Sequence, residues 1–315
     1  MECALHPPPP ADAGGVLTPL TDSQRRLSGG DLLLALLANV VWAFNFIAGK
    51  AGVEHFQPFL FTTLRFAVLL LVLLPFLRWL PGRMRGVFSV AITLGALHFS
   101  LIFLGLKASG DIASVAIASQ LYVPFSTLLA VVWLGETLDG GRLLGMALAF
   151  GGVLVIGFDP IVFQHLDALL LIIAGATVMA VATIQMRQLR GVNVLVLQAW
   201  IALCATPTLA FLSLLFEQSQ WVALRAATGL EWAAPVYSAL GASLIGHGIM
   251  YHLLGRYPVN VTTPLMLLTP VLAVAFGVLL WGDVLSWKLV LGGALTIAGI
   301  VVITVSAATL KPASH

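Results

Sequence analysis

The sequence predicts an all-α membrane protein with ten transmembrane helices in two inverted five-helix repeats, and three observations support this prediction. The first is composition, because 60% of the 315 residues are hydrophobic, only 9% are charged, and the mean hydropathy is +1.03. An average soluble domain is roughly 45–50% apolar and about 25% charged, so this chain lacks the charge to cover a water-soluble surface. The second observation is a succession of apolar stretches of membrane length, and the third is an internal repeat.

The apolar stretches begin at Leu32 and are separated by short polar breaks. A membrane-spanning helix needs roughly 20 apolar residues, and the fifth stretch is the shortest. The ten predicted spans are Leu32–Gly52, Pro58–Leu80, Gly86–Leu106, Asp111–Leu134, Arg142–Gly157, Asp167–Gln188, Val192–Phe216, Trp232–Leu254, Asn260–Trp281 and Trp287–Thr309. Because lipid cannot satisfy freed backbone groups, prolines inside several spans predict kinks that face protein or a watery cavity. These prolines are Pro75, Pro124, Pro207, Pro264 and Pro270.

The two ends of the chain are expected to be cytoplasmic tails. Residues 1–31 contain four consecutive prolines and no apolar segment, so we expect a flexible tail and no cleavable signal peptide; residues 310–315 form a second short tail. Ten of the Lys and Arg residues fall at the predicted inner ends of the spans and only four at the outer ends. The positive-inside rule then places both termini in the cytoplasm, in a multi-pass protein of the bacterial inner membrane.

An internal repeat relates the fifth predicted span to the tenth. At an offset of 147 positions, "WLGETLDGGRLLGMALAFGGVLVIG" from Trp133 and "LWGDVLSWKLVLGGALTIAGIVVIT" from Leu280 share nine identical residues, and Glu136 pairs with Asp283. A repeat of five helices is odd-numbered, so the second copy must enter the bilayer upside down. We therefore predict repeats at residues 32–157 and 167–309, an architecture typical of transporters, whose site lies near the midplane between the halves.

Several motifs resemble one known family. "LALLANVVWAFNFIAGKAGV", then "TTLRF", then "GETL" before a Gly-rich helix are similar to the EamA-type families of the drug/metabolite transporter superfamily, as is "LLGRYPVNVTTPLMLLTPVLAVAFGVLLWGDVL" in the second half. The resemblance covers Leu32 to about Thr309. It implies ten helices in two inverted halves and export of small metabolites, often amino acids. Asp283 departs from the family pattern, which usually has Glu there.

Arg65 is the one charged residue well inside a predicted span. It lies seven residues after Pro58, which places it ~10 Å into the bilayer at 1.5 Å per residue. An unpaired Arg at the bilayer centre costs about 2.5–3.5 kcal/mol on insertion scales. Two interpretations remain open: the guanidinium lines a cavity and attracts a substrate carboxylate, or it bonds backbone carbonyls at a helix end or extends outward to the interface.

Other polar residues inside the spans are candidates for lining a substrate cavity. Asn39, Trp42, Asn45 and Gly49 follow one stripe of the first span. A lipid-facing stripe would not contain two amides, so we expect this face to turn inward, where Asn45 could form an interhelical hydrogen bond or contact the substrate. Gln120 lies four residues before Pro124, where the missing backbone donor is expected to leave a carbonyl unpaired. The predicted substrate-binding residues are Trp42, Asn45, Arg65, His98, Gln120, Ser243, His247 and Tyr251, the last three following one face of the eighth span.

Absent motifs narrow the function. None of the 13 carboxylates lies in mid-span, which disfavours cation–proton antiport, and one deep Arg is too few for phosphate-bearing substrates. The chain has no His-Glu-x-x-His, phosphate loop or Gly-x-Ser-x-Gly elbow, so we expect no enzyme, catalytic residue, metal or cofactor.

We expect a carrier, acting as a monomer in the lipid bilayer, that exports small metabolites, amino acids first, by gradient-following alternating access. The alternatives are an exporter of drugs or other lipophilic compounds and a channel-like pore. The net charge of +2 gives no indication of nucleic-acid binding.

Overall fold

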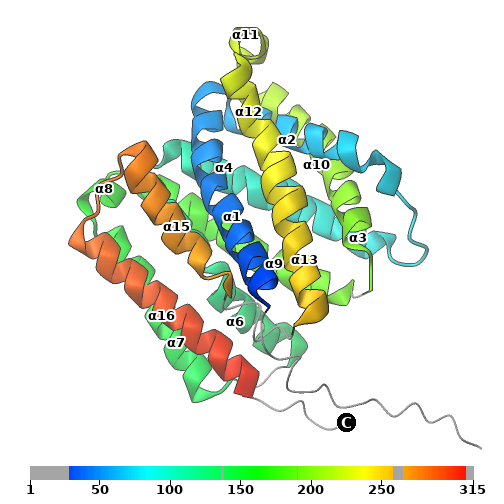
Figure 1. The fold of residues 1–315 in the computed structure, drawn as a ribbon. Coiled ribbons are helices and arrows are strands. Elements are labelled where there is room, and N and C mark those ends of the chain that lie inside the picture. The colour runs from blue at the N-terminus through cyan, green and yellow to red at the C-terminus, as the bar shows by residue number, and fades with distance from the viewer. Residues whose placement is uncertain (1–27, 136–137, 190, 258–264, 310–315) are drawn as a thin grey trace, which may run out of the picture.

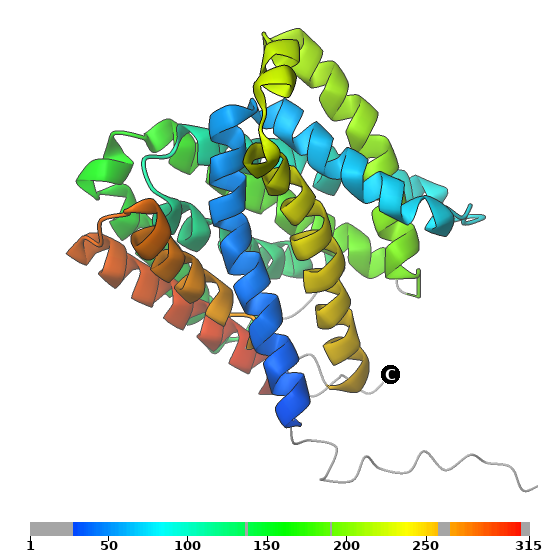
Figure 2. The same ribbon diagram turned by 45° about the horizontal axis from the view of Figure 1, so that its top comes forward.

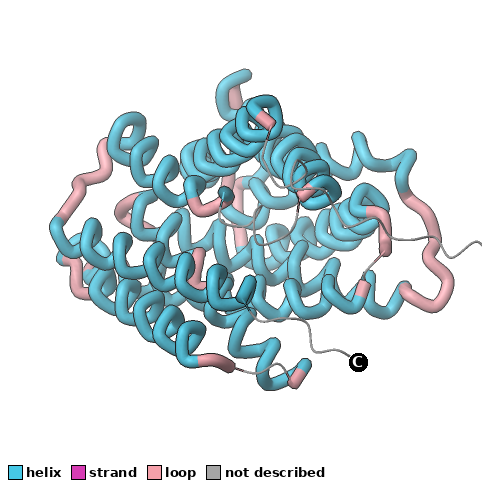
Figure 3. Tube along the Cα trace, turned by 60° about the horizontal axis from the view of Figure 1, so that its bottom comes forward, coloured by secondary structure: helices cyan, strands magenta, loops and turns pink. Residues whose placement is uncertain are grey.

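The fold is a bundle of helices. The computed structural model describes residues 28–135, 138–189, 191–257 and 265–309, and every regular element within these ranges is a helix (Figure 3). The helices of the first half are α1 (Gly29–His55), α2 (Pro58–Leu73), η2 (Leu74–Phe76), α3 (Met84–Val90), η3 (Ala91–His98), α4 (Phe99–Ala108), α5 (Ile112–Ser119), α6 (Tyr122–Leu134) and α7 (Gly140–Gly157). Those that follow are α8 (Pro160–Phe163), α9 (Leu166–Gln188), α10 (Val194–Phe216), α11 (Gln220–Ala226), α12 (Gly229–Tyr237), η4 (Ser238–Gly246), α13 (His247–Arg256), α15 (Leu268–Phe276), η5 (Gly277–Trp281) and α16 (Trp287–Thr309).

Eight helical stretches of the described chain are long and apolar enough to cross a membrane. They correspond to the first seven predicted spans and the tenth. The predicted eighth span is helical from Gly229 to Arg256 through α12, η4 and α13. The predicted ninth begins at Asn260, outside the described residues, and its described part contains a shorter apolar helix, Leu268–Trp281. The expected tails lie largely outside the described residues, since α1 already begins at Gly29.

Local sequence explains where several helices begin and end. Asp111, Asp139 and Asn193 are N-caps whose side chains accept hydrogen bonds from the first-turn amides of α5, α7 and α10, which satisfies donors that a helix start leaves unpaired. Gly135 and Gly282 end α6 and η5 in the left-handed conformation, at φ 67° and 82°. Glycine adopts this conformation without steric cost.

The helix break near Pro124 differs in one respect from the prediction. The chain leaves the helix at Gln120 and Leu121, between α5 and α6, as a proline three or four residues later would lead one to expect. The Gln120 carbonyl, however, accepts a hydrogen bond of 3.0 Å from the Val123 amide. The expectation of an unpaired carbonyl was therefore wrong, because a tighter turn supplies the donor that Pro124 lacks.

Helices from the two halves pack against each other throughout the bundle. Figures 1 and 2 show α7 and α16 side by side along their length, and they also show α1 lying between α15 and the α12–α13 stretch. Contacts between α2 and α10 and between α4 and α9 complete the main pairings. Glycines allow the α7–α16 approach, since an added Cβ at Gly145 would lie 2.6 Å from the Gly299 carbonyl oxygen.

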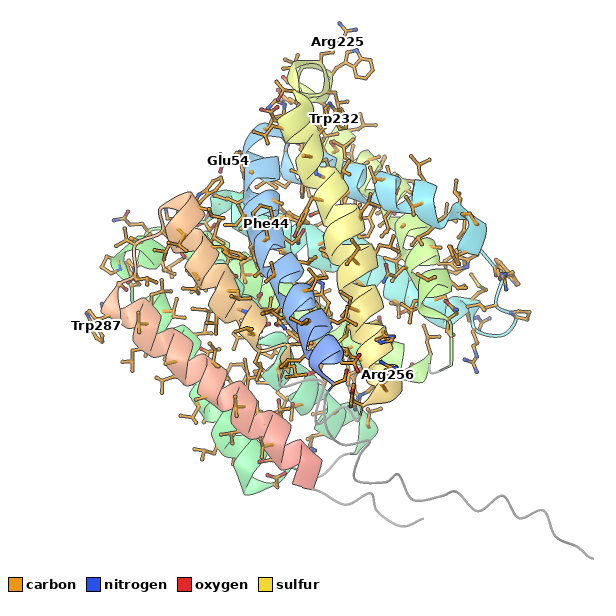
Figure 4. The ribbon with its side chains drawn as sticks, in the orientation of Figure 1. Phe44, Glu54, Arg225, Trp232, Arg256 and Trp287 are labelled. Carbon is orange, nitrogen blue, oxygen red and sulfur yellow. The ribbon has the colours of Figure 1, made fainter. Side chains whose placement is uncertain are left out.

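The bundle has two distinct ends. Figure 4 shows Arg256 beside the start of α1 at one end, and Glu54, Arg225 and Trp232 at the other. The described part of the chain begins and finishes at the Arg256 end, where α1 starts and α16 stops (Figures 1 and 2).

Candidate functional site

Arg65 is the largest fully buried side chain of the described residues and lies where the two halves meet. It projects from α2 and is 2% exposed. Its Nη2 donates a hydrogen bond of 2.9 Å to the hydroxyl of Ser243 on η4. Nε and Nη1 are buried without a hydrogen-bond partner among the described residues. Among the described residues, Arg65 therefore forms no hydrogen bond to a backbone carbonyl, and its side chain does not reach an exposed surface.

Three phenylalanine rings surround the Arg65 guanidinium. Its central carbon lies 4.0 Å from the ring centroid of Phe99, 5.4 Å from that of Phe66 and 5.7 Å from that of Phe103. Such contacts contribute about 0.5–2 kcal/mol each, depending on desolvation. No ion pair to Arg65 exists within the described ranges, so its charge is only partly compensated.

Two imidazoles lie close to this cation. His98 ends η3, and its Nδ1 lies 2.9 Å from the Gly175 carbonyl oxygen on α9. His247 begins α13, and its Nδ1 lies 3.0 Å from the Ala242 carbonyl oxygen. Because a carbonyl can only accept, Nδ1 is the protonated nitrogen in both bonds. Both rings are within electrostatic range of the Arg65 guanidinium.

The segments that carry His98 and Ser243 are both π-helical. Ala91–His98 (η3) and Ser238–Gly246 (η4) have one more residue per hydrogen-bonded turn than an α-helix. Such insertions are rare and occur frequently at functional sites. Here one of them ends at His98 and the other contains Ser243, the hydrogen-bond partner of Arg65.

Residues of α1 complete the neighbourhood. The Trp42 indole donates to the Ala242 carbonyl at 3.0 Å and packs edge-on against His247, with ring centroids 5.4 Å apart. Asn45 accepts a hydrogen bond from the hydroxyl of Ser238. The prediction that the α1 stripe turns inward is confirmed for Asn39 and Gly49, both of which are buried.

Six of the eight predicted site residues are therefore brought together by contacts or electrostatic proximity. They are Trp42, Asn45, Arg65, His98, Ser243 and His247. Gln120 lies at the α5–α6 break, and no hydrogen bond or ring contact of the described residues joins it to the others. The side chain of Tyr251 lies outside the described residues. Sequence reasoning missed Phe99 and Phe103, since a phenylalanine in an apolar helix carries no signal of what it packs against.

Two buried carboxylates at the end of the bundle opposite Arg256 also connect the two halves. Sequence reasoning did not predict these contacts. Asp283, in the loop before α16, accepts hydrogen bonds of 2.8 and 2.9 Å from the amides of Ile112 and Ala113 at the start of α5. Glu217, at the end of α10, accepts from the amides of Phe59 and Leu60 at the start of α2. Each carboxylate compensates the positive end of a helix dipole from the other half of the chain. Burial raises the pKa of Asp283 above its ordinary value, against the opposing effect of its two amide donors.

A third polar contact between halves lies at the Arg256 end. Asp31, in the first turn of α1, accepts 3.1 and 3.2 Å hydrogen bonds from Nη1 of Arg256 and a 2.7 Å bond from the hydroxyl of Tyr257. Ser28 adds a fourth hydrogen bond at 2.8 Å. The halves are thus joined at both ends of the bundle, with Arg65 between.

The arrangement offers unsatisfied hydrogen-bond donors in an apolar setting. It brings together a cation with free N–H groups, two imidazoles and a hydroxyl, walled by aromatic rings. No group of three or more metal-ligating side chains occurs among the residues that the structure describes. The chemistry available is recognition of a small molecule with a negatively charged or acceptor-rich group.

Comparison with known sequences finds one family. The chain matches the EamA-like transporter family twice, over residues 30–158 and 166–305. It is 30% identical over 267 residues to a protein of Escherichia coli (strain K12) named "Probable amino-acid metabolite efflux pump", covering 81% of this chain and 88% of that one. A protein of the same name from Salmonella typhimurium is 30% identical over 269 residues, covering 82% of this chain and 89% of that one.

A solved structure has a similar fold. It is described only as the crystal structure of a protein, is 22% identical in sequence, and superposes with a TM-score of 0.61 over 91% of this chain and 100% of its own. At that identity, the likeness shows the fold alone.

Proposed function

The chain belongs to the EamA-like transporter family, and from that premise we propose that it exports small metabolites, amino acids first, across a bacterial inner membrane. The family makes the chain a multi-pass membrane transporter and not an enzyme. The observation that carries the choice of substrate is the buried Arg65, whose free donors fit the carboxylate that every amino acid has. The names of the Escherichia coli and Salmonella relatives support the same choice.

Ten transmembrane helices in two inverted repeats form the carrier, with repeats at residues 32–157 and 167–309. The double family match supports this arrangement. So do the two π-helical segments, whose first residues, Ala91 and Ser238, are separated by the 147 positions that relate the repeats. The helix pairings support it too, because α4 packs on α9 as the α13 stretch packs on α1.

Both termini lie in the cytoplasm, which makes the Arg256 end the inner end. The distribution of Lys and Arg supports this orientation. Residues 1–31 and 310–315 are then cytoplasmic tails.

Substrate passes between the halves by alternating access. The predicted site residues, Gln120 and Tyr251 included, line the path, and the polar contacts between halves act as its gates. Asp283 and Glu217 join the halves at the outer end, and Asp31 with Arg256 joins them at the inner end. Each set consists of a few hydrogen bonds that can break in turn, which supports an alternation between outward-open and inward-open states.

Transport follows the substrate gradient. No Asp or Glu lies in the middle of a predicted span, so the path lacks the carboxylate by which many carriers move a proton. The cell's own excess of metabolite then provides the driving force.

The test is efflux from liposomes that contain the purified protein and one radiolabelled amino acid at a time. We expect saturable efflux for a subset of amino acids, counterflow when unlabelled substrate is present outside, and no uphill accumulation after an imposed pH jump. Protein-free liposomes are the control. Flux that does not saturate and shows no counterflow would indicate a pore, and efflux of lipophilic cations but of no amino acid would indicate a drug exporter.

A further inference from the structure

The guanidinium of Arg65 retains a complete hydrogen-bonding edge. Arginine has five N–H donors, one on Nε and two on each Nη. Ser243 takes one of the two on Nη2, and Nε and Nη1 have no partner among the described residues. One Nη2 hydrogen lies beside the Nε hydrogen and the other lies beside an Nη1 hydrogen. Whichever of them Ser243 accepts, the remaining one and its neighbour form an edge of two parallel donors. A carboxylate binds such an edge through both of its oxygens.

We propose that Arg65 is the receptor for a single carboxylate of the transported molecule, bound through two parallel N–H···O bonds. This inference rests on the proposed function and adds the group of the substrate that is recognised. A buried cation without a counter-ion costs several kcal/mol, and the described residues provide no counter-ion. A substrate carboxylate supplies the missing charge and accepts the two missing hydrogen bonds together.

The surroundings favour a single carboxylate next to an apolar group of the ligand. Phe66, Phe99 and Phe103 lie around the guanidinium and contribute no second cation for a doubly charged group. Lys50 provides a contrast, because this second buried cation is satisfied by the protein itself. Its ammonium is hydrogen-bonded to the carbonyls of Leu106 and Ser109 at 2.9 Å and paired with Glu54 at 3.2 Å.

The location of Arg65 also suits a transported ligand. Its hydrogen bond to Ser243 joins α2 to η4, which belong to different halves of the chain. Since the side chain is only 2% exposed, a ligand reaches it when the halves move apart. The Arg65–Ser243 bond therefore lies on the surface along which alternating access must open the protein.

The test measures binding separately from transport. Purified protein in chloride-free buffer is titrated with L-phenylalanine, 3-phenylpropanoate and L-phenylalaninamide, and the midpoint of thermal unfolding is followed. The first two ligands carry the carboxylate and the third does not. We expect the carboxylates to stabilise the wild-type protein at concentrations at least about tenfold lower than the amide, since charge-assisted bidentate bonds are roughly twice as strong as neutral ones.

Variants identify the receptor. Arg65→Gln should abolish the preference for carboxylates, and Arg65→Lys should weaken it about tenfold, because an ammonium keeps the charge but cannot form the two-donor edge. Lys50→Gln is the matched control, a buried cation whose removal should leave the preference unchanged. Should Arg65→Gln fail to fold, Arg65→Lys alone decides the matter.

Three results would overturn the inference: no preference for carboxylates in the wild type, an unchanged preference in Arg65→Lys, or equal loss in Lys50→Gln. Arg65-dependent carboxylate binding together with no efflux of any amino acid would refute the exporter and leave the receptor standing. Saturable efflux with an Arg65-independent preference would do the reverse.

Discussion

The carboxylate of Glu217 accepts a 2.7 Å hydrogen bond from the backbone amide of Phe59, 158 residues earlier in the chain. Its other oxygen accepts from the Leu60 amide at 3.0 Å and from the Ser213 hydroxyl at 2.7 Å. The start of α2 has no capping side chain of its own. A residue at the end of α10 therefore caps a helix in the other half, and this contact is buried.

Removal of this cap should destabilise the protein. Glu217→Ala leaves two buried amides without an acceptor, and we expect a loss of about 1–3 kcal/mol in the free energy of unfolding. Glu217→Gln keeps one acceptor oxygen and should lose less. Unfolding in mixed micelles with increasing SDS measures both, with Asp167→Asn as the control, because the Asp167 side chain is exposed. Equal stability of Glu217→Ala and Asp167→Asn would contradict the assignment.

Gly277 is required by the contact between Asp283 and α5. An added Cβ at Gly277 would collide with the Asp283 carboxylate that caps Ile112 and Ala113. We expect Gly277→Ala to lower the unfolding midpoint, although Gly→Ala within a helix usually stabilises by about 0.5–1 kcal/mol. Gly248→Ala is the matched control, since nothing lies within 4 Å of a Cβ there, and it should be neutral or stabilising. If both variants lower the unfolding midpoint, or both raise it, the collision at Gly277 is refuted.

Two adjacent glycines of α7 should respond in opposite ways. An added Cβ at Gly152 would lie 2.5 Å from the Gly292 carbonyl oxygen on α16, whereas one at Gly151 would meet nothing within 4 Å. Because backbone cannot move aside as a side chain can, Gly152→Ala should cost about 1–3 kcal/mol. Gly151→Ala should be tolerated. Comparable yields and melting temperatures for the two variants would show that α7 and α16 do not pack as described.

The carboxyl of Asp111, which precedes the Ile112–Leu134 span, should make stability depend on pH. Burial raises its pKa above the ordinary 3.8, against the hydrogen bonds from Ser114, and nearby Asp283 and Asp159 add to the rise. A raised pKa means that the folded protein holds this proton more tightly than the unfolded chain does. Its stabilising contribution is therefore complete below pH 3.8 and is lost as pH rises through the folded-state pKa.

Asp111→Asn keeps an N-cap side chain but removes the titration. The unfolding midpoint of this variant should fall less between pH 4 and pH 8 than that of the wild type, as measured by scanning fluorimetry. Asp111→Ala, which removes the cap as well, should be less stable than Asp111→Asn at every pH. Parallel pH profiles of the wild type and Asp111→Asn would mean that Asp111 titrates normally.

The proposed orientation can be tested with a reporter that is active only in the periplasm. Fused after Lys311, it should be silent, and inserted at Gln218, in the loop between α10 and α11, it should be active. The physical reason is the excess of Lys and Arg at the inner ends of the spans. The opposite pattern would reverse the orientation and exchange the assignments of inner and outer gate.

The sequence by itself determined the membrane class and most of the helices. Lipid requires long apolar helices because it cannot satisfy a free backbone group. The composition and spacing of residues therefore predicted the eight helices of the described chain that are long and apolar enough to cross a membrane, which match the first seven predicted spans and the tenth. Gly135 and Gly282, which the repeat aligns, both end helices in the left-handed conformation. The burial of Asn39 followed from two amides on one helix stripe.

Only the tertiary structure decided what the polar residues contact. The sequence showed Arg65 as a deep charge and left the structural and the carboxylate interpretations open. The tertiary structure adds that its guanidinium donates a hydrogen bond to Ser243, 178 positions away. Glu217 and Asp283 read as ordinary loop carboxylates, and the amides that they cap lie more than 150 residues earlier. Hydropathy shows how apolar each helix is, whereas these contacts depend on which helices pack against each other. Packing between segments that lie far apart in the chain determines that pairing.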